Sequence, residues 1–266
     1  MQQYLRYASL GSGSSGNALV IEARCGQSTT RLLLDCGFSV RETSKRLARL
    51  NLTGQDIHAV LITHEHDDHI GGAARFARKF GSPLYMSRGT YLSVMRHATH
   101  SCDGLDVQFC RDEHSFSIND LSIHPYTVPH DAREPLQFTF SLNQLRLGVL
   151  TDVGHITHRM IDALKGCHGL VLEYNYDAHM MANSKYPPTL RHRITGDYGH
   201  LDNNISQSLL LALVHDDLHH VHAAHISQNN NQKAVVQSLL EDALRPHDIP
   251  FALACQDEGF DWFEVV

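Results

Sequence analysis

Short apolar runs rich in β-branched residues recur along the chain and are separated by polar segments. Such runs, bounded by turn residues, are typical of strands buried in a sheet. They predict strands at Leu5–Leu10, Ala18–Glu22, Arg31–Asp35, Ala59–Thr63, Leu121–Val128, Leu136–Leu142, Leu145–Leu150, Leu170–Glu173 and Val221–Ala224. Several of these strands follow one another without an intervening helix, which indicates antiparallel hairpins.

Stretches with helical spacing of apolar residues lie between the strands. They predict helices at Arg41–Leu50, His69–Phe80, Ile156–Leu164, Ile205–Val214 and Lys233–Leu244. This mixed α/β order fits two packed sheets covered by helices from outside. Because no long linker, low-complexity segment or solenoid repeat interrupts the 266 residues, we expect one domain over residues 1–266.

The composition is that of an ordinary globular protein, with 42% hydrophobic and 19% charged residues. No apolar run approaches the roughly 20 residues that span a membrane, and the segment Met1–Arg6 lacks the pattern of a secretory signal. The six cysteines include no CxxC pair and are expected to be buried thiols. We therefore expect a cytoplasmic protein with no membrane partner.

The net charge of −7 argues against a protein that binds polyanions through a general coat of Lys and Arg. It does not exclude nucleic acid as a substrate, because bound divalent ions reverse the local field. It does imply few phosphate contacts away from such ions, and so a weak dependence of binding on salt. The 21 histidines prove nothing by number, so their spacing must decide.

Residues 59–72 join a buried-strand pattern to six consecutive polar residues, four of which are candidate metal ligands. His64 and His66 are two apart, so both rings lie on one side of an extended segment. Asp68 and His69 follow where the chain turns into a helix, and they can serve a neighbouring metal ion. A polar loop that caps a helix would explain one aspartate but not three histidines in six residues.

A zincin site is also excluded, because its HExxH motif would begin at His64 and require a histidine where Asp68 stands. Three further candidates each follow an apolar strand: His130, Asp152 and His225. Alone each signal is weak, since a histidine after a strand is more often structural. Together with the first motif they supply seven nitrogen and oxygen ligands, which is enough for two metal ions that share one carboxylate.

With these residues the chain resembles the metallo-β-lactamase superfamily from Asp35 to His225, and it carries the HxHxDH signature as His64-Glu-His-Asp-Asp-His69. The resemblance implies an α/β fold, a four-layer αββα sandwich of two mixed sheets flanked by helices. It also implies a first metal ion on His64, His66 and His130, a second on Asp68, His69 and His225, and Asp152 as the bridge. Asp35 would support the ligands from behind.

Within the superfamily the chain is similar to the YycJ/VicX/WalJ group of phosphodiesterases and nucleases. The similar segments are Ser9–Asn17, Thr151–Gly154, Glu173–Asp177, Gly199–Asn203 and His225–Asn230. Members of the group are described as 5′-to-3′ DNA exonucleases, so the resemblance implies a nuclease with nucleic acid, and DNA in particular, as its substrate. The group's Gly-His-Leu-Ser-Asn segment has Asp202 here in place of the serine.

The expected chemistry is hydrolysis by a metal-bridging hydroxide. Two divalent ions roughly 3.5–4 Å apart lower the pKa of a bridging water to about 7. Imidazole ligands favour Zn²⁺, whereas the carboxylates would also accept Mn²⁺. We expect Asp68, Asp152 and His200 to be the catalytic residues. His200, in a Gly-His loop, would protonate the leaving oxygen or bind the phosphate, although local structural bonding is the alternative reading.

The segment Gly11–Gly16 satisfies the GxGxxG pattern of nicotinamide-dependent oxidoreductases. Those glycines should open a helix, but the residues that follow predict a strand, so we interpret the segment as a hairpin turn. It is either a plain flexible turn or a nest that binds a phosphate. In the second case the substrate contacts would come from Ser12, Ser14, Ser15, Asn17 and His200.

Two other groups of residues remain open. Residues 191–193 with Lys185 and Arg159 would line a path for an anion or form a solvated basic patch. The dense histidines between His215 and His222 are explained by strand and turn placement, without a second metal site.

Other activities of the superfamily fit less well. Enzymes that hydrolyse β-lactams carry cysteine where Asp152 stands, and only about 40 residues follow His225, too few for the helical domain of a glyoxalase-type thioesterase. The remaining alternatives are a hydrolase of another small phosphodiester or thioester, and a non-catalytic metal-binding regulatory protein. The complete ligand set speaks against the second alternative.

Overall fold

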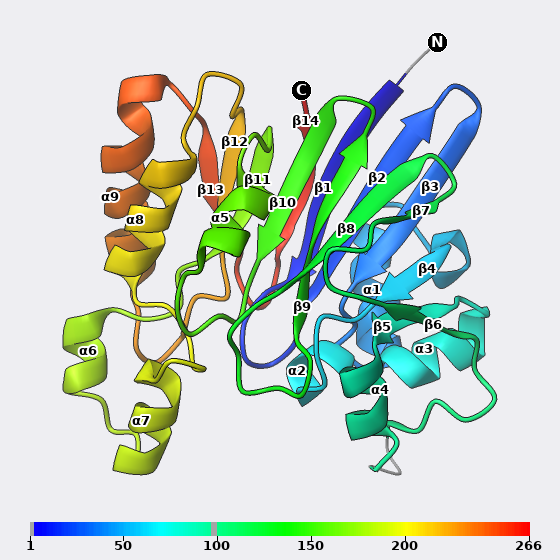
Figure 1. The fold of residues 1–266 in the computed structure, drawn as a ribbon, viewed down its shortest axis with the longest axis horizontal. Helices are drawn as coiled ribbons and strands as arrows, with labels where there is room; N and C mark the ends of the chain where they lie inside the picture. Colours follow the sequence, from blue (N-terminus) through cyan, green and yellow to red (C-terminus); the bar gives the residue numbers. More distant parts are fainter. Residues whose placement is uncertain (1–2, 97–99) are drawn as a thin grey trace.

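The computed structural model describes residues 3–96 and 100–266 and contains two seven-stranded sheets (Figure 1). The strands of the first sheet are β1 (Gln3–Gly11), β2 (Ala18–Cys25), β3 (Ser28–Leu34), β4 (Ala59–Leu61), β5 (Leu84–Ser87), β6 (Val107–Cys110) and β14 (Phe260–Val265). Their order is β14-β1-β2-β3-β4-β5-β6. The last strand of the chain therefore closes the edge beside the first strand.

The strands of the second sheet are β7 (Phe116–Ile118), β8 (Leu121–Thr127), β9 (Leu136–Leu142), β10 (Leu145–Leu150), β11 (Gly169–Glu173), β12 (His220–Ala224) and β13 (Phe251–Leu253). Their order is β13-β12-β11-β10-β9-β8-β7. In both sheets an antiparallel series leads into a parallel one, from β3 to β6 in the first sheet and from β10 to β13 in the second.

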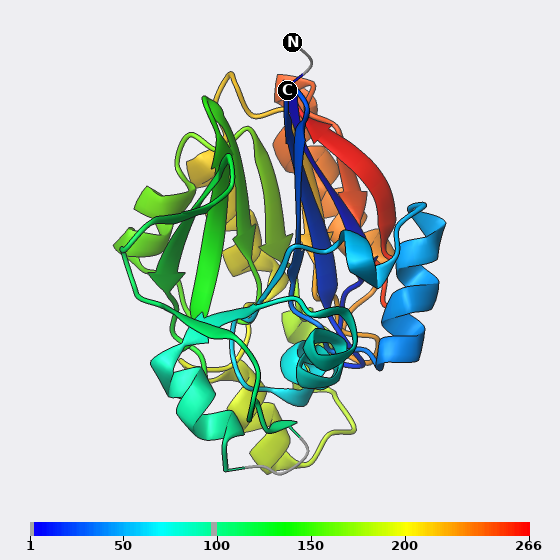
Figure 2. The ribbon, with the colours of Figure 1, turned by 90° about the vertical axis from the view of Figure 1, so that its right-hand side faces the viewer.

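Helices lie on the outer faces of the two sheets, and Figure 2 shows the sheets side by side with α1 outside the first sheet. The first sheet is covered by α1 (Val40–Arg49) and α3 (Ala73–Phe80), and the second by α5 (His158–Leu164), α8 (Asn203–Leu213) and α9 (Lys233–Leu244). Shorter helical segments are α2 (Asp67–Ile70), α4 (Arg88–Val94), α6 (Ala178–Ala182) and α7 (Pro188–Thr195), with 3₁₀ turns at Gly54–Asp56 and Arg245–His247.

Three separate apolar cores divide these elements into four layers. Along β3, Leu32 and Leu34 pack into the core between the sheets, whereas Leu33 packs toward the helices. This alternation follows from the two-residue period of a strand. Because both faces of the central strands are buried, they read as continuous apolar runs. The αββα sandwich expected from the sequence is confirmed.

The predicted helix at His69–Phe80 is wrong in one respect, because it is broken into α2 and α3. At the break, a Cβ on Gly72 would lie 1.9 Å from the carbonyl oxygen of Phe38, so only glycine permits the close approach of these segments. The elements that the pattern did not predict are short and mixed in polarity: β5, β6, β7, β13, β14, α4, α6 and α7.

Of the expectations drawn from composition, that of buried thiols is correct for four of the six cysteines. All six are free, and Cys25 is exposed while Cys255 is half-buried. None of the helices in the described part of the chain combines the length and apolarity of a membrane-spanning segment. The single-domain organisation stays a prediction.

Candidate metal centre

The site lies where strands from both sheets end at a common edge. β3 and β4 run parallel with Leu34 opposite Leu61, and β10 and β11 run parallel with Leu150 opposite Leu172. The carboxyl ends of parallel strands are where ligands gather in α/β folds. The polar residues that follow or end these strands and the neighbouring parallel strand β12 are Asp35, His64, Asp152, Glu173 and His225.

The structure brings together all seven residues that the sequence singled out as metal ligands. The ligand atoms of His64, His66 and His130 lie within 4.8 Å of one another, as do those of Asp68, His69 and His225. Asp152 belongs to a third such group with His64 and His69, so it stands between the other two. Two adjoining ligand sets that share one carboxylate match the arrangement needed for two ions.

In the first set the ring nitrogens of three histidines converge. His64 Nε2 and His130 Nε2 lie 3.0 and 3.3 Å from His66 Nδ1. Burial, together with the charge on His69, holds the pKa of His64 well below its ordinary value, and burial lowers the pKa of His130 to about 4. Both imidazoles are therefore neutral near pH 7, which is the form that binds metal.

The second set combines two carboxylates with two imidazoles. His69 Nε2 lies 3.1 Å from Asp152 Oδ2 and 3.5 Å from Asp68 Oδ2, and His225 Nε2 lies 3.6 Å from Asp68 Oδ2. Two atoms at the centre, Asp152 Oδ2 and His225 Nε2, are buried and lack a hydrogen bond within residues 3–96 and 100–266. Buried polar atoms are costly without partners, so this donor set fits a divalent metal ion.

The charge states of the second ligand set also fit a divalent metal ion. Burial opposes ionisation of Asp152, but His225 and His69 outweigh it and hold the pKa of Asp152 well below its ordinary value. Burial opposes the charge on His225 as well, yet Asp152 and its neighbours raise the pKa of His225 to about 10. His225 is thus protonated when no metal is bound, so metal binding must release a proton.

The backbone is strained at the three residues that leave these strand ends. Asp35, Asp152 and His225 have φ angles of 60°, 56° and 54°, in the left-handed region that non-glycine residues rarely adopt. Such strain is concentrated at functional sites and must be balanced by the surrounding structure. Here the left-handed turn redirects each chain at the sheet edge, where its side chain joins the cluster.

Asp35 supports the ligand His69 from behind, as the resemblance implied. Its Oδ2 accepts a hydrogen bond from His69 Nδ1 at 2.8 Å, and its Oδ1 accepts one from the backbone N–H of Thr63 at 2.9 Å. Burial raises the pKa of Asp35, although His69 opposes the rise. A bond from Nδ1 leaves Nε2 of His69 as the ligand atom and fixes the orientation of its ring.

Glu173 plays the equivalent part for His225 and His200. Sequence reasoning did not assign it a role. Its fully buried carboxylate accepts hydrogen bonds from His200 Nδ1 at 2.9 Å, from His225 Nδ1 at 3.1 Å and from the backbone N–H of Asp152 at 3.1 Å. Oε2 also accepts from Leu201 N at 3.1 Å. A charged residue that ends an apolar strand was the available signal, the same signal that marked Asp35.

His200 lies beside the metal ligands and lines the open cavity above them. Because its Nδ1 donates to Glu173, Nε2 is the ring atom left to face a substrate. The Gly-His loop thus holds His200 against a buried carboxylate, which a merely local role for the loop would not require.

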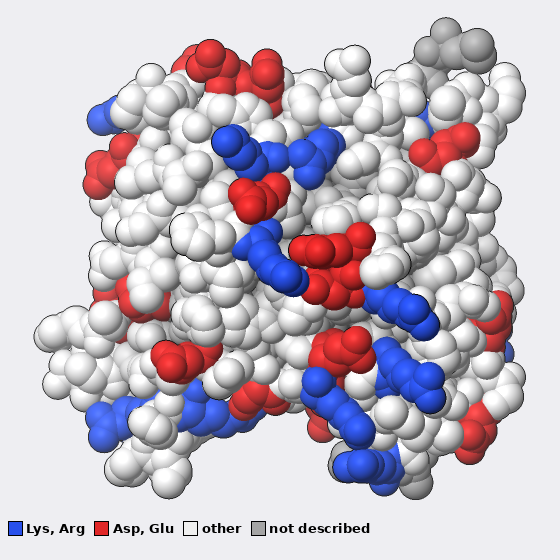
Figure 3. All heavy atoms as spheres, in the orientation of Figure 1, with Lys and Arg blue, Asp and Glu red and all other residues white. Residues whose placement is uncertain are grey.

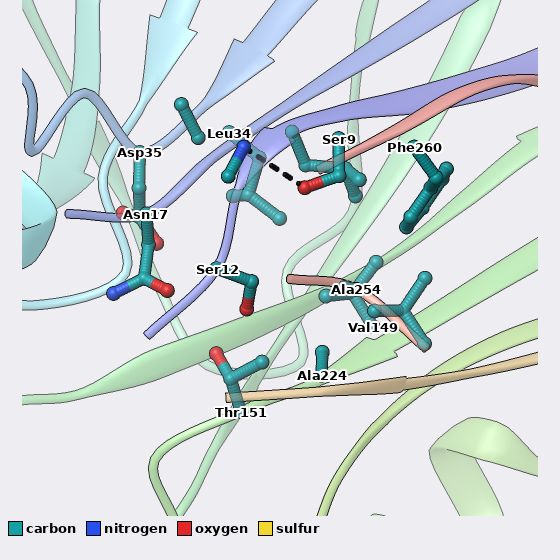
Figure 4. Close-up of a pocket in the computed structure, with 14 residues that line it drawn as sticks. Ser9, Ser12, Asn17, Leu34, Asp35, Val149, Thr151, Ala224, Ala254 and Phe260 are labelled. Carbon is teal, nitrogen blue, oxygen red and sulfur yellow. Dashed lines mark hydrogen bonds between the residues drawn. The ribbon is translucent and has the colours of Figure 1, made fainter. Parts of the chain in front are cut away.

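The Gly-Ser loop divides into residues that support ligands and one that faces the cavity. Ser12 Oγ accepts the backbone N–H of His225 at 2.9 Å, and Asn17 Nδ2 lies 3.2 Å from Asp68 Oδ2. Figure 4 shows Ser12, Asn17 and Asp35 around a small internal cavity of about 30 Å³ between the sheets. Ser14 lines the open cavity beside His200, whereas Ser15 is exposed and its backbone N–H donates to Gln256 Oε1.

The open cavity has a volume of about 410 Å³ and reaches from the metal ligands to Tyr186 and α7. Tyr186 and Arg193 contribute to its wall, and Arg193 pairs with Asp131 at 2.5 Å. Of the other predicted basic residues, Arg191 bonds a carbonyl oxygen and Arg159 pairs with Asp112, so neither reaches this cavity. Of the residues of the predicted anion path, Arg193 is the one that lines this cavity.

Comparison with known proteins agrees with this geometry. Residues 30–233 match the family described as the Beta-lactamase superfamily domain. The chain is 31% identical over 242 residues to exodeoxyribonuclease YycJ of Bacillus anthracis, covering 90% of this chain and 89% of the relative. It is 30% identical over 246 residues to exodeoxyribonuclease WalJ of Streptococcus pneumoniae, covering 92% and 90%.

Among solved structures, the metallo-beta-lactamase fold protein YhfI of Bacillus subtilis superimposes with a TM-score of 0.70 at 14% identity, covering 98% of this chain and 99% of that one. This likeness shows the fold. With most of the chain matched by the family and by relatives of about 30% identity, the protein belongs to the β-lactamase superfamily, as the resemblance of its HxHxDH segment predicted.

Proposed function

We propose that this chain is a metal-dependent hydrolase that acts as a 5′-to-3′ exonuclease on DNA with two divalent ions, Zn²⁺ or Mn²⁺. The observation that carries the proposal is the convergence of seven nitrogen and oxygen ligands into two adjoining sets. Relatives of about 30% identity that are named exodeoxyribonucleases support the choice of substrate. The protein would act as a single domain in the cytoplasm, where free thiols persist.

The ligand sets divide between two ions. His64, His66 and His130 would hold one, Asp68, His69 and His225 the other, and Asp152 would bridge them. The ions, when bound, would supply an activated water and neutralise charge on the phosphate. Asp35 and Glu173 would keep the imidazoles oriented.

His200 would donate the proton that the leaving oxygen needs. Its Nδ1–H is held by Glu173, so Nε2 is the ring atom that faces the cavity and would carry that proton. His200 positioned in this way would bind the phosphate first and then protonate the leaving group. Glu173 would act as a positioning residue, because it touches His200 and His225 rather than the substrate.

The end of the DNA strand would be recognised by the Gly-Ser loop. Ser14 is the serine of the predicted phosphate seat that lines the cavity, while Ser12 and Asn17 would act through His225 and Asp68. Tyr186 and Arg193 on the facing wall offer an aromatic ring and a cation to a nucleotide.

The test compares hydrolysis of 5′-phosphorylated and 5′-hydroxyl oligonucleotides, a cyclic dinucleotide, a β-lactam and a lactoyl thioester with Mn²⁺ or Zn²⁺. We expect stepwise release of mononucleotides from the 5′-phosphorylated strand. Equal cleavage of both 5′ ends would keep the nuclease but remove the terminal-phosphate seat. Turnover of the lactam or thioester with intact oligonucleotides would contradict the nuclease and leave only the superfamily assignment.

A further inference from the structure

A second groove lies beside the metal centre, between α4, the end of β6 and residues 133–134. Its volume is about 550 Å³, and it is lined by side chains of Arg88, Leu92, Phe109, Arg111, Asp112, Arg133 and Glu134 among others. Figure 3 shows Lys and Arg side chains gathered at the lower right of this face, over the region of α4, with acidic side chains between them. The protein as a whole is acidic, so this local gathering of cations stands out.

The cations in the groove are available to a ligand. Arg88, Arg111 and Arg133 are all exposed, and none has a carboxylate within salt-bridge distance in the part of the chain that the structure describes. The two acidic residues are already engaged. Asp112 accepts the backbone N–H of Thr127 and pairs with Arg159, and Glu134 accepts the backbone N–H of Gly89.

Apolar side chains stand among these arginines. Phe109 is 50% exposed and Leu92 is 39% exposed, although residues of this size are usually covered. The Phe109 ring is held in an edge-to-face contact with Tyr91, with ring centroids 5.3 Å apart. Guanidinium groups that alternate with an exposed aromatic ring are the combination that binds single-stranded nucleic acid, through phosphates and stacked bases respectively.

The groove is continuous with the metal centre along the backbone. His130, in the first ligand set, is three residues from Arg133, so at most about 10 Å of chain separates their backbones. The backbone N–H of Arg133 donates to Glu65, between His64 and His66, at 2.8 Å. Glu134 in turn anchors the start of α4 through Gly89 at 2.5 Å. A DNA strand that follows residues 130–134 away from the metal centre would therefore reach this groove.

We propose that this groove binds the single-stranded part of the DNA substrate beyond the phosphate that is cleaved. Arg88, Arg111 and Arg133 bind backbone phosphates, and Phe109 stacks on a base. The inference rests on the proposed nuclease function and deepens it, because it assigns the binding of the DNA strand to residues outside the set of metal ligands. Binding in the groove keeps the DNA strand on the protein while nucleotides are removed from its end.

The first test measures KM for two 5′-phosphorylated substrates, a thymidine strand of about 16 nucleotides and a dinucleotide. Phe109→Ala should raise KM for the long strand roughly 5- to 100-fold, the loss expected for one stacked base, and leave KM for the dinucleotide unchanged. Leu211→Ala removes an exposed apolar side chain on α8 and serves as the control. Unchanged KM for the long strand in Phe109→Ala, or equal changes for both substrates, would overturn the proposal.

The second test measures binding of an uncleavable phosphorothioate strand to the metal-loaded protein at several salt concentrations. Replacing Arg88, Arg111 and Arg133 with Ala should reduce the slope of log K against log salt by about 2, because each phosphate contact on a single strand contributes about 0.7. Replacing Arg41, Lys233 and Arg245 removes the same charge elsewhere. Equal effects of the two triple variants would show that net charge alone, and not this groove, determines the salt dependence, and would overturn the proposal.

These outcomes separate the two proposals. If the wild type cleaves no DNA, the nuclease function fails, and the strand-binding measurement still decides whether the groove holds single-stranded DNA. If the wild type cleaves DNA and the groove variants match their controls, the groove fails and the nuclease function stands.

Discussion

The two halves of the molecule build the metal centre in different ways. The first half contributes four ligands from one stretch of six residues, His64 to His69, at the end of β4. The second half contributes three ligands that are far apart in sequence. His130 follows β8, and Asp152 and His225 follow β10 and β12, the parallel strands on either side of β11. A contiguous motif is visible in a single sequence, whereas a set assembled by strand pairing is visible only in part.

The halves are nevertheless equivalent in one structural respect. Each places a buried carboxylate behind its imidazoles, Asp35 behind His69 and Glu173 behind His225 and His200. The difference is that Asp35 supports metal ligands alone, whereas Glu173 also holds the proposed proton donor. The following predictions test that difference.

The largest effect is expected from the loss of a ligand in either half. His66→Ala in the first half and Asp152→Ala in the second should each lower the metal content and abolish hydrolysis, because His66 would hold one of the proposed ions and Asp152 would bridge the two. Metal analysis and activity on a 5′-phosphorylated strand measure the two effects. Full activity of Asp152→Ala would show that Asp152 does not bridge the two ions.

His200→Ala should lower kcat by roughly 10²–10⁴-fold, the typical loss of a general acid, without loss of metal. His192→Ala, at an exposed position on α7, is the matched control and should be unchanged. Parallel losses of kcat and metal would show that His200 is a ligand or a structural support. Turnover at the wild-type rate would show that His200 has no role in catalysis.

The two supporting carboxylates should separate under saturating metal. Asp35→Asn and Glu173→Gln should each weaken metal binding roughly 10- to 100-fold, as is typical for residues that orient ligands. Added metal should restore kcat in Asp35→Asn but not in Glu173→Gln, because the amide no longer holds His200 Nδ1–H in the same way. Equal rescue of both variants would show that Glu173 acts on metal binding alone.

A smaller effect is expected away from the site, at Glu22 on β2. Its buried carboxylate pairs with Arg6 at 2.5 Å and with Arg31. Burial opposes its ionisation, but hydrogen bonds from Tyr4 and Arg31 outweigh burial and lower the pKa of Glu22. Glu22→Gln should therefore reduce the free energy of unfolding by about 1–2 kcal/mol at pH 7, a modest figure because both arginines are partly exposed to solvent.

The pH dependence of this loss has a defined sign. A lowered pKa in the folded protein stabilises it above the unfolded value of about 4.3, and that stabilisation is lost as the pH falls further. Denaturant unfolding of Glu22→Gln and wild type should thus converge in acid. Glu258→Gln, at an exposed carboxylate, should show no difference at either pH, and a constant gap between Glu22→Gln and wild type would contradict the ion pair.

The sequence predicted the central strands well, because strands buried on both faces are continuous apolar runs. It could not predict edge strands such as β7 and β13, whose three residues are too short for a period to show. It found His130 and His225 only through their place after a strand. It missed the role of Glu173, because that role depends on the pairing of β11 with β10 and β12, which brings Asp152 and His225 to its carboxylate.

The measurement that tests the account most directly is the activity of metal-free protein on a 5′-phosphorylated DNA strand as Mn²⁺ or Zn²⁺ is added in known equivalents. Two ligand sets that share the Asp152 carboxylate predict that nucleotide release rises until two ions are bound per chain and then stays constant. The same ions should raise the melting temperature, since they bind the folded state. Full activity with one ion per chain, or cleavage of DNA without any, would contradict the dinuclear centre.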